Sequence, residues 1–245
     1  MLERGLVILG ALGEHPDGMV LTDIVKATGL PVSTTHRLLN IVVTTGFAAF
    51  DSATKRYTLG VRIFELASRV RSVQTISQIA RPLMRELADL TGETIQLAVL
   101  ADGSAMFLEK VGADRSITIR GTVGQREPLW ATSTGKVLLA ALEPEELETT
   151  LAGLELRAYT EHTITSRERL LETIAQVAEQ DWALTDEEYD RDVRAIAVPV
   201  RNSDDRVAAA LCIAGPKYRL DVGTLEGWLP ELRETAHRIG VQLAP

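Results

Sequence analysis

The chain has 245 residues, of which 45% are hydrophobic, a length and composition suited to one large domain or two modest ones with well-packed cores. Its net charge of −8 is unevenly distributed, because residues 1–72 contain eight Lys/Arg and six Asp/Glu, a net +2, which leaves −10 for the rest. A single cysteine excludes an internal disulfide, no Cys/His cluster has zinc-ligand spacing, and no apolar run approaches the ~18 residues of a membrane span. We therefore expect a cytoplasmic protein without cofactor, metal or membrane partner, in which only the N-terminal part has the charge of a nucleic-acid-binding domain.

Three helices are predicted in the first 46 residues. Leucines recur at helical spacing over residues 2–13. Thr22 is the expected N-cap of a short helix over residues 23–28. A turn containing Gly29 and Pro31 separates this helix from a third one, which Ser33 would cap and Gly46 would end.

The third helix has a polar beginning and an apolar continuation. Its first turns contain Thr34, Thr35, His36 and Arg37, which can all donate hydrogen bonds, and its buried side would consist of Leu38, Leu39, Ile41 and Val42. Helix-turn-helix proteins contact base edges with the N-terminal residues of their second helix. We therefore predict that residues 33–42 form a DNA recognition helix. A solvated first turn on an ordinary helix is the alternative for this segment taken alone.

A short hairpin follows, with strands over residues 47–50 and 55–59 and a polar turn between them. Lys55 and Arg56 begin its returning strand. Three helices and a basic hairpin describe a winged helix-turn-helix over residues 1–59, in which the wing contacts the DNA backbone or the minor groove. The alternative is that the two cations only keep the surface soluble.

The segment 60–73 is predicted to be a linker helix with one apolar stripe: Ile63, Leu66, Ala67, Val70 and Val73. A second helical run over residues 76–90 contains Pro82, which should start or kink a helix. Because little other chain is near the linker stripe, a second subunit is expected to bury it, together with Leu2 and Leu6 of the first helix. This pattern predicts a homodimer.

Residues 74–245 alternate between strand and helix patterns. Strands are expected over 95–100, 106–111, 117–120, 183–185, 195–200 and 207–214. Helices are expected over 135–142, 144–151 and 167–180, and a last one carries the apolar stripe from Leu225 to Leu243; Thr132 or Ser133 would cap the first of these. The almost continuous apolar run 207–214 is typical of a central strand covered on both faces. These elements predict a mixed α/β sheet with packed helices.

Several of these segments, in this order, resemble the IclR family of bacterial transcriptional regulators over almost the whole chain. The resemblance rests on residues 22–25, 28–31, 33–39, 46–47 and 56–60, and on 129–140, 186–189, 193–200 and 213–216. It implies an α+β protein with a winged helix-turn-helix, a linker helix and a C-terminal GAF-like effector-binding domain. It also implies a dimer, or a dimer of dimers, whose affinity for double-stranded operator DNA changes with a small ligand. The expected DNA-binding residues are Thr22, Ser33, Thr34, Thr35, His36, Arg37, Lys55 and Arg56.

The resemblance also implies where an effector binds. Family members that sense small oxo-acids such as glyoxylate or pyruvate hold the carboxylate at positions that correspond here to Ser133, Thr134, Thr185, Ala195, Cys212 and Ala214. The N–H groups at the start of the Gly135 helix suit an anionic group. The other positions have lost an acid, a thiol and two hydroxyls relative to the family pattern, so we expect a less polar pocket and an acid with a larger apolar body, aromatic or branched. Met106 and Trp130 are candidates for its wall or for the core.

An enzyme is the competing class of protein. The sequence around Thr134, Gly135 and Lys136 lacks the first glycine and the Ser/Thr of a phosphate-binding loop. Cys212 lies in an apolar strand with no histidine near it in sequence, and the acidic residues 186–190 fit no metal-ligand spacing. We therefore assign no catalytic residue. A ligand-independent DNA-bound regulator remains an alternative.

Overall fold

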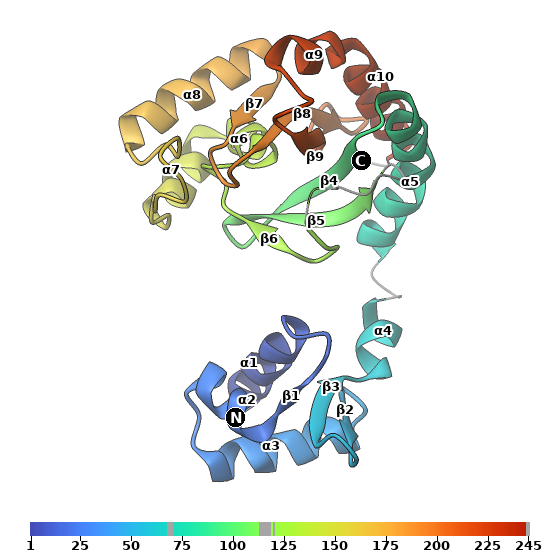
Figure 1. Ribbon diagram of the computed structural model, residues 1–245, viewed down its shortest axis with the longest axis vertical. Coiled ribbons are helices and arrows are strands. Elements are labelled where there is room, and N and C mark those ends of the chain that lie inside the picture. The colour runs from blue at the N-terminus through green and yellow to red at the C-terminus, as the bar shows by residue number, and fades with distance from the viewer. Residues whose placement is uncertain (68–70, 113–118, 120, 244–245) are drawn as a thin grey trace. The chain divides into compact units, whose positions relative to one another are not determined.

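The computed structural model describes residues 1–67, 71–112, 119 and 121–243 (Figure 1). The chain divides into two compact units, Met1–Gln74 and Thr75–Pro245. Each unit has its own buried core. In the described part of the chain, no helix has the length and apolar character needed to cross a lipid bilayer.

The N-terminal unit combines helices with a small sheet. Its elements are α1 Leu2–Gly13, β1 Met19–Val20, α2 Leu21–Thr28, α3 Val32–Thr44, β2 Ala48–Asp51, β3 Arg56–Leu59 and α4 Val61–Ala67. Ile8, Leu12, Ile24 and Leu39 are almost completely buried between the three first helices. The sheet has the order β1-β3-β2, with antiparallel pairs. The sequence did not predict β1, because two residues are too short to show an alternating pattern.

Helices α2 and α3 both begin earlier than predicted. The residue preceding α2 is Val20 and the residue preceding α3 is Pro31, and neither position has a side-chain cap. Thr22 and Ser33 are therefore each the second residue of a helix, and the prediction that they cap it was wrong. The reason is that β1 leads directly into α2, and that Pro31, with ψ of 142°, already has the extended backbone of a cap residue. Gly29 ends α2 with φ of 66°, a conformation that favours glycine.

The linker region consists of two helices, α4 and α5 Arg71–Thr91. No side chain of α4 is buried. Pro82 lies inside α5 and neither starts nor ends it. The stripe on either side of Pro82 is buried, so its packing offsets the missing N–H bond, which costs about 3 kcal/mol in a helix interior. Val70 and the side chain of Val73 lie outside the described part of the chain.

The C-terminal unit is built on a six-stranded sheet of order β6-β5-β4-β9-β8-β7. The strands are β4 Thr94–Ala101, β5 Ser104–Val111, β6 Arg126–Glu127, β7 Ala183–Asp186, β8 Val193–Arg201 and β9 Val207–Pro216. All of these neighbours pair antiparallel. As predicted, β9 is central and buried on both faces. Most of the predicted strand 117–120 lies outside the described residues, and Ile119 belongs to no strand.

Helices cover both faces of this sheet (Figure 1). On one face α5, α9 Val222–Gly227 and α10 Leu229–Gly240 bury a core that includes Ile95, Leu97 and Ile213. On the other face α6 Ser133–Ala140, α7 Pro144–Ala152 and α8 Arg167–Gln180 bury a core that includes Phe107 and Cys212. The last predicted helix is in fact two, α9 and α10, with Trp228 between them.

Candidate functional site

The N-terminal end of α3 presents a polar, accessible surface. Ser33, His36 and Arg37 are exposed, and Thr34 is half-buried. The Nδ2 atom of Asn40 lies 3.5 Å from Nδ1 of His36, one helical turn further on. No hydrogen bond or ion pair with another described residue engages the guanidinium of Arg37. These side chains are placed to contact an external partner.

Two residues of α3 lie elsewhere than predicted. Thr35 is completely buried, and its hydroxyl donates to the carbonyl oxygen of Pro31 over 3.1 Å. It therefore stabilises the start of the helix and cannot reach a base edge, so its place in the predicted DNA contact set was wrong. Ile41, expected in the core, is 41% exposed. Ile41 is exposed because the four apolar residues in 38–42 extend around more of the helix than the side that packs against the core.

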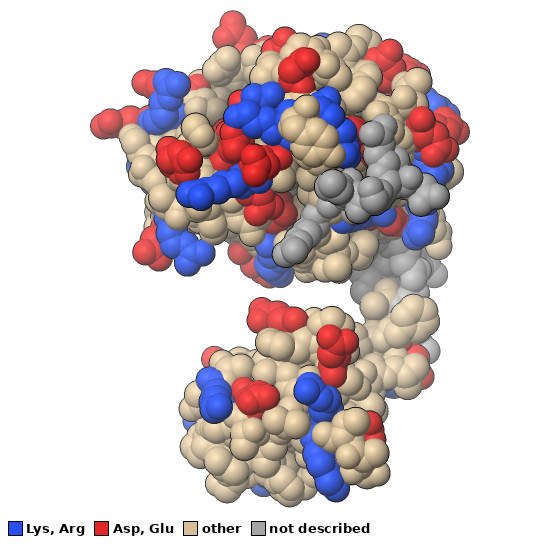
Figure 2. All heavy atoms as spheres, viewed as in Figure 1, with Lys and Arg blue, Asp and Glu red and all other residues tan. Residues whose placement is uncertain are grey.

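The two basic residues of the wing, Lys55 and Arg56, differ in their position and in their contacts. Lys55 lies in the turn between β2 and β3, exposed, with φ of 57°. Arg56 is also exposed, but its Nη1 donates to the carbonyl oxygen of Gly18 over 2.5 Å. Arg56 therefore ties the wing to the segment before β1. Figure 2 shows basic side chains forming a band on the drawn face of this unit.

In the C-terminal unit, a hollow of about 420 Å³, including the space open to solvent, lies beside the start of α6. Its walls come from β4, β6, β7, β8, β9, the start of α6 and the β7–β8 connection. Six of the predicted pocket residues meet there: Ser133, Thr134, Thr185, Ala195, Cys212 and Ala214. They come from four elements separated by up to about eighty residues of sequence, and β8–β9 pairing sets Ala195 opposite Ala214.

Three other predicted pocket residues do not line the hollow. Gly135 packs closely against the backbone of Leu129, because a Cβ at this position would lie 2.4 Å from the Leu129 carbonyl oxygen. Met106 packs on the opposite face of the sheet, since alternation along β5 puts Ala105 and Phe107 on the α6 side. Trp130 belongs to the core under α6, and its Nε1 donates to the carbonyl oxygen of Arg157 over 3.2 Å. Of the two alternatives that the sequence left open for Met106 and Trp130, pocket wall or core, the structure places both residues in the core.

The hollow is more polar than the sequence predicted. Its lining also includes Gln96, Ile119, Glu127, Thr132, Glu188, Tyr189, Asp190 and Val193. The carboxyl groups reach it from β6 and from the β7–β8 connection, outside the positions that the family pattern suggested. Of these additional lining residues, Gln96 could have been noticed in the sequence, because it is a polar residue inside the apolar strand Thr94–Ala101. Side chains alternate along a strand, and this alternation turns Gln96 toward α6.

Burial and neighbouring charges shift several titrations in the hollow. Burial, and next the Asp190 carboxylate, raise the pKa of Glu127 to about 7, while the Lys110 ammonium opposes this shift. Lys110 itself donates to the carbonyl oxygens of Ile119 and Gly121. Burial raises the pKa of the Cys212 thiol, which donates to Oε1 of Gln96 over 3.4 Å. Such a thiol is a poor nucleophile, so Cys212 is a wall residue of the hollow.

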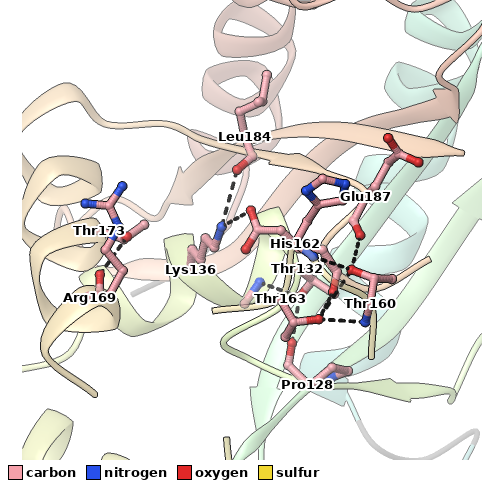
Figure 3. A network of polar contacts seen from close by, with 12 residues as sticks. Pro128, Thr132, Lys136, Thr160, His162, Thr163, Arg169, Thr173, Leu184 and Glu187 are labelled. Atoms are coloured by element: carbon pink, nitrogen blue, oxygen red, sulfur yellow. Dashed lines mark hydrogen bonds and ion pairs between the residues drawn. The ribbon is translucent and has the colours of Figure 1, made fainter. Parts of the chain in front are cut away.

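A network of polar contacts holds the β7–β8 connection beside α6 (Figure 3). Lys136, only 2% exposed, places Nζ 2.5 Å from Oε1 of Glu188 and 3.5 Å from the carbonyl oxygen of Leu184. Burial lowers the pKa of Lys136 and raises that of Glu188, and the contact between the two groups opposes both shifts. The hydroxyls of Thr160 and Thr163 donate to the carbonyl oxygens of Glu187 and Glu188, each over 2.6 Å.

The start of α6 has one cap and several open donors. The Thr132 hydroxyl oxygen accepts from the Gly135 N–H over 3.1 Å, and the Lys136 N–H donates to the Thr132 carbonyl. Of the two cap candidates in the sequence, Thr132 and Ser133, Thr132 is the N-cap. The N–H groups of Ser133 and Thr134 belong to the helix start that has no partner within the helix. Both residues line the hollow.

Comparison with known proteins identifies both units. The model "IclR helix-turn-helix domain" matches residues 1–52, and "Bacterial transcriptional regulator IclR C-terminal" matches residues 68–241. The transcriptional regulator KdgR of Escherichia coli K12 is 34% identical over 236 residues, which cover 96% of this chain and 89% of that protein. The transcriptional repressor IclR of the same organism is 30% identical over 221 residues, covering 89% and 81%. These relatives are named as regulators of transcription, not as enzymes.

Two solved structures with bound aromatic acids are similar to this chain. One is an IclR homolog from Microbacterium hydrocarbonoxydans complexed with 4-hydroxybenzoate, with a TM-score of 0.86, 29% identity, and coverage of 99% of this chain and 98% of that one. The other is a double mutant of the inducer-binding domain of the PobR transcription factor from Acinetobacter, in complex with 3-hydroxybenzoic acid. It has a TM-score of 0.65 and 31% identity, and it covers 68% of this chain and 98% of that one.

Proposed function

Because the chain belongs to the IclR family of bacterial transcriptional regulators, we propose that it binds a near-palindromic operator as a dimer or dimer of dimers and responds to a small organic acid. The observation that carries the DNA-binding part is the exposed group Ser33, His36 and Arg37 at the N-terminal end of α3. In a helix-turn-helix this end of the second helix enters the major groove. Because the rest of the chain is acidic, general electrostatic attraction to the DNA phosphates is not enough for tight binding, and specific contacts must add to it.

Each predicted DNA contact has a specific role in this proposal. Arg37 suits a guanine, to which it can donate two hydrogen bonds, and Ser33, Thr34 and His36 suit bases or phosphates nearby. Lys55 at the tip of the wing contacts the DNA backbone, and Arg56 orients the wing through Gly18. Thr22, exposed in the first turn of α2, suits a phosphate. Thr35 is excluded because it is buried.

We propose that the N-terminal units pair through the apolar surface of α1, with the linker helix α4 contributing. Leu2 is 78% and Leu6 58% exposed, and both line a hollow in which Leu9, Ile41 and Phe47 also take part. On α4, Phe64 and Leu66 are exposed as well. Contiguous apolar surface of this kind marks protein–protein contacts, and a second copy is the partner that a two-fold symmetric operator requires.

Leu6→Glu is expected to convert the dimer to a monomer at micromolar concentration and to weaken operator binding at least tenfold. The reason is that a charge in the paired surface must be desolvated without a partner. Sedimentation velocity and gel shifts measure the two effects. Val241→Glu is the matched control, because Val241 is equally exposed but lies in the other unit. A monomeric parent with full operator affinity contradicts the proposal.

The effector site that we propose is the hollow beside α6. A carboxylate placed at the open N–H groups of Ser133 and Thr134 gains their hydrogen bonds and the positive end of the helix dipole. The side-chain hydroxyls of these two residues add donors. The aromatic acids bound by two similar proteins support an organic acid here too.

The regulator function is tested by selecting DNA from a random pool with the full chain. We expect a near-palindromic site whose half-sites lie about one helical turn, ~10 base pairs, apart or a multiple of this. A panel of organic acids is then titrated into the complex, and at least one acid is expected to change the DNA affinity. DNA binding that no acid changes, together with no heat of binding in calorimetry, favours the ligand-independent alternative. Turnover of a bound acid favours an enzyme.

A further inference from the structure

The hollow beside α6 brings together acidic side chains from the two ends of the six-stranded sheet. Glu127 lies on β6, at one edge, and Asp190 lies in the connection between β7 and β8, at the other. Both line the hollow, and the Asp190 carboxylate is close enough to raise the pKa of Glu127. The hollow thus has acceptor groups as well as the donors at the start of α6.

The cations near these carboxyl groups are already engaged. Lys136 pairs with Glu188, and Lys110 donates to the carbonyl oxygens of Ile119 and Gly121. Within the described part of the chain, no hydrogen bond or ion pair joins Glu127 or Asp190 to a basic side chain, and the Lys110 ammonium acts on Glu127 only through space. Asp190 is exposed and keeps contact with water, whereas Glu127 is half-buried. A carboxyl group that is partly withdrawn from water normally has such a partner, because burying it without one is costly.

A second group in the hollow lacks a partner. Gln96 is 4% exposed, its Oε1 accepts from Cys212, and its Nε2 has no hydrogen-bond partner among the described residues. Leaving a buried amide N–H without an acceptor is unfavourable. Gln96 lines the same hollow, so a bound molecule with an acceptor oxygen satisfies it.

We propose that the effector is an organic acid that also carries a hydrogen-bond donor, a hydroxyl or an ammonium group, away from its carboxylate, and that Glu127 and Asp190 receive this donor. The inference rests on the proposed function and names the chemical class of its effector. The acid end occupies Ser133, Thr134 and Nε2 of Gln96, and the donor end faces the two carboxyl groups. An acid without a donor leaves the half-buried Glu127 without a partner and adds a negative charge beside both carboxyl groups.

The effector affinity changes with pH in opposite directions depending on whether Glu127 accepts a hydrogen bond from the effector or donates one to it. Asp190, Tyr189, Lys110 and Cys212 surround Glu127, whose pKa is about 7. A donor received by the Glu127 carboxylate lowers its pKa, so binding releases a proton and the affinity rises with pH. If instead protonated Glu127 donated to the effector's carboxylate, binding would take up a proton and the affinity would fall with pH. A decrease of one to two pKa units on binding makes the affinity about fivefold to tenfold higher at pH 8 than at pH 6.

Calorimetry of the full chain with two matched series of acids tests the proposal. The series are benzoate, 4-hydroxybenzoate and 4-(aminomethyl)benzoate, and butyrate, 4-hydroxybutyrate and 4-aminobutyrate. In at least one series the donor-bearing acids are expected to bind at least tenfold more tightly than the unsubstituted acid, and more tightly at pH 8 than at pH 6. The hydroxyl and ammonium members distinguish the two donor types.

Glu127→Gln is expected to remove the rise of affinity with pH and most of the preference for an ammonium group. Glu179→Gln, the same change at an exposed position of α8 outside the hollow, is expected to leave both unchanged. Equal binding of all three acids, an affinity that falls with pH, or no binding of any acid at millimolar concentration overturns the proposal. The pH dependence of the parent protein decides the matter even where the variant fails to fold. Operator gel shifts on the same preparation separately report whether the regulator function itself fails.

Discussion

Replacing Arg37 with alanine is expected to weaken operator binding by about 2–6 kcal/mol, at least about 30-fold, because a dimer loses one bidentate arginine–guanine contact of ~1–3 kcal/mol in each half-site. Arg37 is exposed at the N-terminal end of α3, and it has no partner among the described residues that it would have to leave. The variant is therefore expected to fold like the parent. Its specificity is expected to relax at one base position of each half-site.

Gel shifts on a set of single-base operator variants measure this loss, and Lys55→Ala is the matched control. Lys55 lies at the wing, where we propose a phosphate contact, so its removal is expected to weaken all sequences about equally. It also lowers the steepness of the salt dependence by about one unit per wing. If Arg37→Ala binds every operator variant as the parent does, α3 is not the recognition helix of this protein.

Replacing Glu188 with glutamine is expected to lower the free energy of unfolding by about 3 kcal/mol, at the lower end of the ~3–5 kcal/mol typical for breaking a buried ion pair. The change leaves the Lys136 ammonium, which is 2% exposed, without its carboxylate at 2.5 Å. The glutamine oxygen still accepts a hydrogen bond, and Lys136 can lose its proton because burial already lowers its pKa. Both effects limit the loss.

Urea unfolding measures the difference, and Glu172→Gln provides the control. Glu172 pairs with Arg169 on the exposed face of α8, and such surface pairs contribute about 0–1 kcal/mol. The double variant Lys136→Met/Glu188→Gln is expected to recover part of the lost stability, since it removes the buried charge as well as its partner. Equal stability of Glu188→Gln and Glu172→Gln means that Lys136 is not charged in the folded protein.

The sequence by itself determined most of the longer helices and strands and their order. The bounds of α8, Arg167–Gln180, and the cap of α6 by Thr132 follow from side chains within a few positions of each other. The turn at Gly29 and Pro31 likewise reflects short-range backbone preferences of these two residue types. The central position of β9 followed from its apolar run, because a strand without alternation must be covered on both faces.

Only the tertiary structure decided which side chains meet. Thr35 belongs to a polar run in the sequence, but packing of α3 buries it, while Ile41 stays exposed. Met106 was a candidate for the pocket wall, and only the assembled layers show that it packs on the face of the sheet opposite the hollow. Glu127 and Asp190 are separated by more than sixty residues and by the whole width of the sheet in strand order. Periodicity and capping depend on neighbours along the chain, whereas the polarity of the hollow depends on which distant strands and loops the folded sheet brings together.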